Sequence, residues 1–116
     1  MKTIIAGSRT MTDCEEFKHY MFSIFPDAIN PTEIVSGTAE GADQLGQLWA
    51  MYWKRPVTKF PADWNKYGKA AGPIRNKQMA EYADAAIIFW DGKSRGSANM
   101  IKEAVDHNLK LFVFTI

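Results

Sequence analysis

Residues 33–43 read EIVSGTAEGAD, a short β-branched run followed by two glycines and the start of an apolar pattern at helical spacing. The first four residues are typical of a buried strand, and the glycines are typical of the turn that ends one. A helix is predicted from about Glu40. Because a strand that leads through a short loop into a helix is the repeating unit of a parallel sheet, this stretch predicts an α/β fold.

The same unit recurs along the whole chain. Four segments with helical spacing separate five strand-like runs, which are residues 3–6, 33–36, 57–60, 85–90 and 111–115. This order predicts a Rossmann-like three-layer α/β sandwich, with a mainly parallel five-stranded sheet and helices on both faces.

Short motifs predict where the helices begin and end. Thr12 and Glu15 have the spacing of a capping box, which predicts a first helix that runs on to Pro26. The third helix is expected to open at Gly72-Pro73, because proline suits the first helical turn. Ser97 is expected to cap the fourth helix.

Composition limits the classes of function. The chain has 116 residues, which we interpret as one domain spanning 1–116, and its 14 basic and 13 acidic residues leave a net charge of +1. Nucleic acid is therefore an unlikely partner. One cysteine and two isolated histidines predict neither a disulfide nor a metal site, and no cofactor is predicted. No apolar run is long enough for a membrane span, so the expected location is cytoplasmic.

Glycines and arginines gather at one predicted edge of the sheet. Of the eight glycines, Gly46 lies inside a helix, where it is expected to allow close packing, and the other seven follow strands: Gly7, Gly37, Gly41, Gly68, Gly72, Gly92 and Gly96. Three of the four arginines, Arg9, Arg75 and Arg95, fall in the same loops. Ligands of open α/β sheets bind outside the carboxyl ends of the strands, and guanidinium groups bind phosphate or carboxylate. An anion site is predicted there, although any one of these residues alone is equally typical of a solvated loop.

Two loops carry the strongest signals. The segment 36–43 offers backbone N–H groups, two hydroxyls and a helix N-terminus, which suits a phosphate, but it lacks the spacing of a dinucleotide fingerprint. Asp43 can instead serve only the helix dipole. The segment 92–97 is a small basic loop before a helix, which suits an anion but is also typical of an ordinary flexible turn. It is not a P-loop, because Ile87 stands where that motif needs its first glycine. Trp64 begins an aromatic and polar cluster, for which three roles are expected equally: stacking on a base, packing on the protein's own sheet, or a subunit contact.

These motifs together carry a resemblance that covers essentially the whole chain. The segments 7–9, 36–43, 60–64, 72–76 and 91–97 resemble the YspA and YpsA-related branch of the SLOG superfamily. The resemblance implies a Rossmann-like, often oligomeric protein that binds nucleotides, nucleotide-sugars or NAD-derived signals.

The resemblance and the sheet-edge pattern together give the candidate ligand-binding residues. They are Gly7, Ser8, Arg9, Ser36, Gly37, Thr38, Gly41, Asp43, Trp64, Gly72, Arg75, Asn76, Gly92, Lys93, Ser94, Arg95, Gly96 and Ser97. We expect a module that senses or sequesters a nucleotide-type small molecule, in a homodimer or homotetramer.

An enzymatic alternative follows from the same resemblance. The superfamily includes LOG-type phosphoribohydrolases, which cleave the N-glycosidic bond of nucleoside monophosphates and use a glutamate for it. Met100 stands at the matching position here, so Glu40, Asp43 or Asp91 would have to supply the carboxylate, and the hydrolase hypothesis takes Glu40 or Asp91. Glu40 and Asp91 are therefore the candidate catalytic residues.

Overall fold

The computed structural model describes residues 1–116 and confirms the predicted architecture. Five parallel strands form one sheet in the order β3-β2-β1-β4-β5. The strands are β1 (Lys2–Gly7), β2 (Glu33–Ser36), β3 (Val57–Lys59), β4 (Ala85–Trp90) and β5 (Lys110–Thr115). All five match the strands predicted from sequence to within about one residue.

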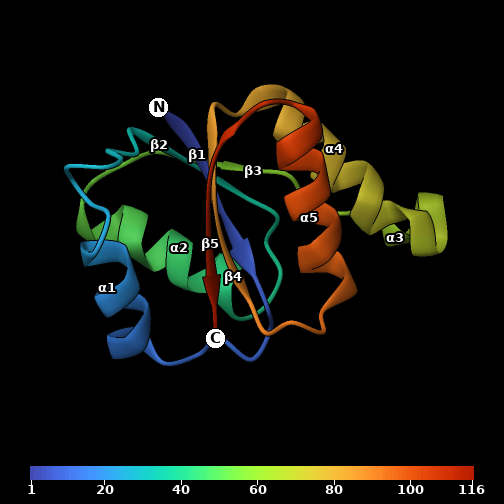
Figure 1. Ribbon diagram of the computed structural model, residues 1–116. Coiled ribbons are helices and arrows are strands. Elements are labelled where there is room, and N and C mark those ends of the chain that lie inside the picture. Colours follow the sequence, from blue (N-terminus) through green and yellow to red (C-terminus); the bar gives the residue numbers. More distant parts are fainter.

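Helices cover both faces of the sheet (Figure 1). One face is covered by α1 (Cys14–Phe22) and α2 (Ala42–Tyr52), and the other by α4 (Ala71–Tyr82) and α5 (Arg95–Asp106). A short helix α3 (Trp64–Tyr67) and a 3₁₀ turn (Gly68–Ala70) lead into α4. No helix is long and apolar enough to cross a membrane.

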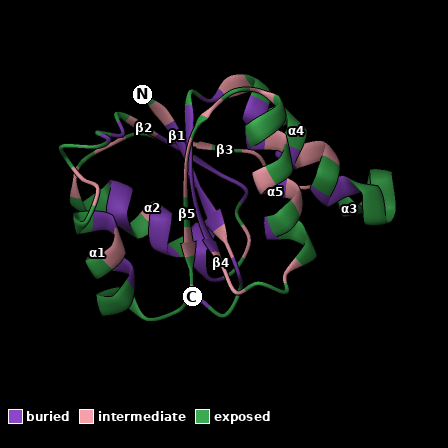
Figure 2. Cartoon of the chain, viewed as in Figure 1, coloured by how far each residue is buried: buried purple, intermediate pink, exposed green.

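Side chains of the central strands alternate between two apolar clusters. In β1, Ile5 packs under α1 and α2, whereas its neighbours Ile4 and Ala6 pack under α4 and α5. The central strands β1 and β4 are accordingly buried along nearly their whole length (Figure 2). The predicted packing role of Gly46 is confirmed, because a Cβ at this position would lie 2.7 Å from Cγ2 of Ile5.

The first two helices begin later than predicted. Asp13, not Thr12, caps α1, and its carboxylate accepts hydrogen bonds from the amides of Glu15 and Glu16. The helix ends at Phe22, well before Pro26. The second helix was expected from about Glu40, but α2 begins at Ala42 because Gly41 has a φ of 79°.

The other two helices also differ at their N-termini. Ser94, not Ser97, caps α5, and its Oγ accepts the Ser97 amide at 3.4 Å. The predicted opening of α4 at Gly72-Pro73 is one residue late, since helical backbone already starts at Ala71. Ser97 and Pro73 both lie inside the first helical turn, so each motif predicts a helix start that is slightly too late.

Candidate functional site

A polar cavity of about 690 Å³ lies at the carboxyl edge of the sheet. The strand order places it beside the switch point between β1 and β4, where the chain leaves β1 toward one face and β4 toward the other. Its volume is in the range of small-molecule sites. The structure therefore has a cavity at the predicted edge of the sheet.

Eleven of the candidate residues line this cavity. They are Arg9, Gly37, Thr38, Glu40, Trp64, Gly72, Arg75, Asn76, Ser94, Arg95 and Gly96. Six further lining residues were missed: Ala39, Pro61, Ala62, Lys69, Pro73 and Asn99. Of these, Asn99 was detectable in principle, because it follows Arg95 by one helical turn and so shares its face of α5.

The remaining candidates do not line the cavity. These are Gly7, Ser8, Ser36, Gly41, Asp43, Asp91, Gly92, Lys93 and Ser97. Ser8 shows what such a residue does instead. Its hydroxyl accepts the Asp91 amide at 3.1 Å, and its carbonyl accepts the amides of Met11 at 3.1 Å and Ala42 at 3.4 Å. Ser8 thus holds together the loops after β1 and β4 and the start of α2.

Four cations and one acid line the cavity. The cations are Arg9, Lys69, Arg75 and Arg95, and the acid is Glu40. None of the five takes part in an ion pair within the protein. Cationic side chains that share a cavity without carboxylate partners repel one another, so an anion bound among them would be stabilised.

Arg75 is the best-positioned of these cations. It is half-buried, and its guanidinium donates from Nη1 to the Gly37 carbonyl at 2.6 Å and from Nε to Oδ1 of Asn76 at 2.9 Å. Burial lowers the pKa of Arg75, and the nearby Asp43 carboxylate opposes that shift. Because Nη1 and Nε already donate these two hydrogen bonds, Nη2 is the guanidinium nitrogen that is free to contact a ligand.

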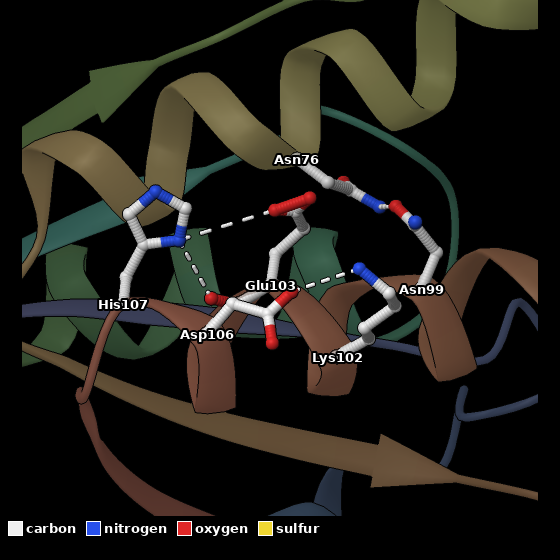
Figure 3. A network of polar contacts seen from close by, with 6 residues as sticks. All are labelled: Asn76, Asn99, Lys102, Glu103, Asp106 and His107. Carbon is white, nitrogen blue, oxygen red and sulfur yellow. Dashed lines mark hydrogen bonds and ion pairs between the residues drawn. The ribbon is translucent and has the colours of Figure 1, made fainter.

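Asn76 fixes Arg75 from the other side. Its amide donates to the Gly96 carbonyl at 3.2 Å and to Oδ1 of Asn99 at 2.9 Å, which joins α4 to the first turns of α5. Figure 3 shows the two asparagine amides meeting between these helices. Further along α5, Lys102 forms an ion pair with Asp106 and His107 contacts Glu103, but none of these four residues reaches the cavity.

The loop after β2 is already occupied by a carboxylate of the protein itself. Asp43 is only 4% exposed, and its Oδ2 accepts the Ala39 amide at 3.1 Å. The Thr38 amide is taken by the Ser36 hydroxyl at 3.1 Å. The backbone donors at positions 38 and 39, which the sequence suggested for a phosphate, therefore serve internal acceptors, and Asp43 stands where an anion would otherwise bind them.

Gly37 lies between Asp43 and Arg75. A Cβ on Gly37 would lie 2.5 Å from Nη1 of Arg75 and 2.9 Å from Oδ2 of Asp43, so only glycine lets the guanidinium and the carboxylate close on the loop from both sides. Burial raises the pKa of Asp43 to about 6, against the lowering effects of the Ala39 amide and the Arg75 charge.

This raised pKa predicts a specific pH dependence of stability. Since the folded-state pKa of Asp43 lies above its ordinary value of 3.8, its contribution to stability is present below about pH 4 and is lost as the pH rises through about 6. The loss is expected to reach about 3 kcal/mol. Urea unfolding of the wild type and of Asp43→Asn from pH 4 to 8 measures it as the difference between the two curves.

Comparison with Asp43→Asn separates the effect of the Asp43 carboxyl from those of the other titrating groups. Glu33, Asp91 and Asp106 have lowered pKa values, because hydrogen bonds to Tyr82, to loop amides and to Lys102 stabilise their charged forms, and they act equally in both proteins. Arg75 is the charged side chain that acts on Asp43 from the neighbouring α4. If the free energies of unfolding of the two proteins change in parallel with pH, the pKa of Asp43 is not raised in the folded protein and this prediction is wrong.

The Asp91 side chain stabilises the turn that precedes α5. Its Oδ1 accepts the amides of Lys93 at 2.9 Å and Ser94 at 2.8 Å, and these bonds lower the pKa of Asp91. It shapes the loop before α5 and places Ser94 as the cap. Behind this cap the amides of Arg95 and Gly96 begin α5 without intrahelical partners, at a wall of the cavity.

Trp64 forms an apolar wall of the same cavity. The indole is 54% exposed, and it packs over the start of α4, where a Cβ on Gly72 would lie 3.3 Å from its Cη2 atom. Pro61 and Pro73 line the cavity with it. The site thus combines a cationic part with an aromatic and proline-rich part.

Comparison with known proteins gives one relative. No protein-family model and no solved structure matches the chain significantly. Over 113 residues the chain is 30% identical to the Gene 61 protein of Mycobacterium phage D29, and the alignment covers 89% of this chain and 87% of the phage protein. The shared region includes most of both proteins, so the chain belongs to the family of this phage Gene 61 protein.

Proposed function

We propose that the protein binds a nucleotide, or a nucleotide-derived phosphorylated small molecule, in the cavity at the carboxyl edge of the sheet and acts as a sensor or sequestering module. The observation that carries this proposal is the set of four cations without ion-pair partners that share one cavity with a single carboxylate. The resemblance to the SLOG superfamily supports the same class of ligand.

The two parts of the cavity suit the two parts of a nucleotide. Arg9, Arg75 and Arg95 supply charged donors for a phosphate, and the N-terminus of α5 adds the amides of Arg95 and Gly96. Trp64 offers an exposed indole on which a base can stack. A free phosphate would use only the first part, so a whole nucleotide is expected to bind more tightly than phosphate.

A thermal-shift screen tests the proposal. The panel contains AMP, ADP-ribose, NAD, cyclic nucleotides and nucleoside monophosphates, with the matching nucleosides and inorganic phosphate as controls. We expect at least one nucleotide to raise the melting temperature in a concentration-dependent way. Native mass spectrometry and chromatography then show whether the bound ligand is intact. No stabilisation by any phosphorylated compound would contradict the proposal.

A second candidate function rests on Glu40. Glu40 is exposed and is the carboxylate that lines the cavity, which is the requirement for hydrolysis of the N-glycosidic bond of a nucleoside monophosphate. Asp91 is less suited, because its oxygen is held by two loop amides. Met100, at the position of the LOG-type glutamate, is buried.

Glu40→Gln separates the two functions. If the protein is a hydrolase, the variant is expected to release free base at least about 100-fold more slowly with little change in binding. If it is a binding module, removing a negative charge from a cationic cavity is expected to strengthen nucleotide binding a few-fold, with no free base from either protein. Glu81→Gln is the matched control, since Glu81 is an exposed glutamate of α4 outside the cavity.

A further inference from the structure

A second surface of the molecule is strongly apolar. Four large apolar side chains of α1 and α2 are more than half exposed: Phe22 at 54%, Leu48 at 55%, Met51 at 73% and Tyr52 at 76%. We call this surface the α1–α2 face. It is the exposed side of the helical layer opposite α4 and α5 (Figure 2). An apolar patch of this kind typically marks an interaction site.

The α1–α2 face is hollowed along the line where its two helices meet. A groove of about 290 Å³ is lined by eight apolar residues and one lysine: Cys14, Phe17, Lys18, Phe22, Leu45, Leu48, Trp49, Tyr52 and Trp53. It shares no residue with the cationic cavity. Met51 extends the same exposed strip of α2, so the face carries both a hollow and protruding apolar side chains.

The charges of this face identify the kind of partner. The one charged residue of α2 is Asp43, which is buried, so the exposed side of this 11-residue helix carries no charge. Such a surface gives an acidic or basic partner nothing to recognise. A second copy of the chain, however, can meet it without repulsion between like charges.

The neighbouring helix adds charge complementarity of the same type. On α1, Lys18 lines the groove and forms an exposed ion pair, 3.5 Å long, with Glu15. In a two-fold arrangement with α1 perpendicular to the axis, the two copies of α1 run antiparallel, so Glu15 of one copy can face Lys18 of the other. Antiparallel helix dipoles are also favourable.

We propose that the α1–α2 face is the interface of a two-fold homodimer of this chain. The hollow and the protruding side chains on one face make it self-complementary, as an isologous interface requires. Leu48 and Tyr52 lie where the groove meets the exposed strip of α2, and they are the residues expected to anchor the contact.

Sedimentation equilibrium over a wide concentration range tests the interface. The wild type is expected to dimerise, and Leu48→Glu and Leu48→Lys are each expected to dimerise more than about tenfold more weakly, because each copy would bury a charge. Mixing the two variants in equal amounts is expected to restore dimers, since opposite charges then face each other. Val105→Glu is the matched control, because Val105 is 59% exposed on α5 in the opposite layer.

Each outcome decides the proposal. A wild type that stays monomeric at high micromolar concentration would overturn it, and so would a dimer that Val105→Glu disrupts and Leu48→Glu does not. A small apolar molecule retained by the monomer in native mass spectrometry would assign the groove to a ligand instead. Circular dichroism of each variant shows that it is folded, so loss of the dimer cannot be mistaken for loss of the fold.

Discussion

Replacing Arg75 with alanine is expected to weaken nucleotide binding by about 100-fold. The change removes a partly desolvated guanidinium from the cavity, and hydrogen bonds to charged groups contribute about 1.5–3 kcal/mol each. It also releases the Gly37 carbonyl and Oδ1 of Asn76, both of which Arg75 now holds. Isothermal titration with whichever nucleotide stabilises the wild type measures the loss.

Two further variants show whether the effect is specific. Arg75→Lys keeps the charge but cannot bridge the loop and α4 at once, so its affinity should lie between those of the wild type and the alanine variant. Lys77→Ala removes an exposed cation from the same helix outside the cavity and should bind normally. Unchanged affinity in Arg75→Ala would remove Arg75 from the site.

Gly7→Ala is expected to have the largest effect on stability. Gly7 ends β1 with a φ of 152°, and a Cβ there would lie 2.2 Å from the carbonyl oxygen of Phe89 in the adjacent strand. Neither backbone can move without breaking the ladder between β1 and β4. We expect the free energy of unfolding to fall by more than about 3 kcal/mol, measured by urea unfolding.

Gly96 provides the matched control for that prediction. A Cβ on Gly96 meets nothing within 4 Å, and the residue lies in the first turn of α5. Gly96→Ala should therefore leave stability unchanged or raise it by up to about 1 kcal/mol. Equal destabilisation by the two alanines would mean that the close approach of β1 and β4 at Gly7 is not what requires glycine there.

The fold was predictable because its signals are local. Each strand is a short run rich in β-branched or aromatic residues, most clearly Ala85–Trp90, and a glycine or a break in periodicity follows each of the first four. Parallel pairing then follows from the alternation of strands and helices. Helix starts were less predictable, because Thr12 and Asp13, or Ser94 and Ser97, are equally good caps in isolation and tertiary contacts decide between them.

The candidate site was predictable in outline, as the cavity at the sheet edge, but the separate roles of its residues were not. Arg9, Arg75 and Arg95 were found because strand ends meet at one edge of a parallel sheet. Nothing local distinguishes the buried Asp43 from the exposed Glu40 three residues earlier. Which of them meets a ligand depends on how α2 packs against β1, and that contact is formed by residues far apart in the sequence.

The most direct test of the nucleotide site is an amide NMR titration of the protein with AMP, ADP-ribose and NAD, each beside its unphosphorylated nucleoside. A phosphorylated ligand is predicted to shift the amides of Arg95 and Gly96 and the indole of Trp64, with much smaller changes from the nucleoside. The amides of Leu48 and Tyr52 on the α1–α2 face should not move. Shifts confined to that face, or no saturable shift with any of the three nucleotides, would contradict the assignment of the cationic cavity.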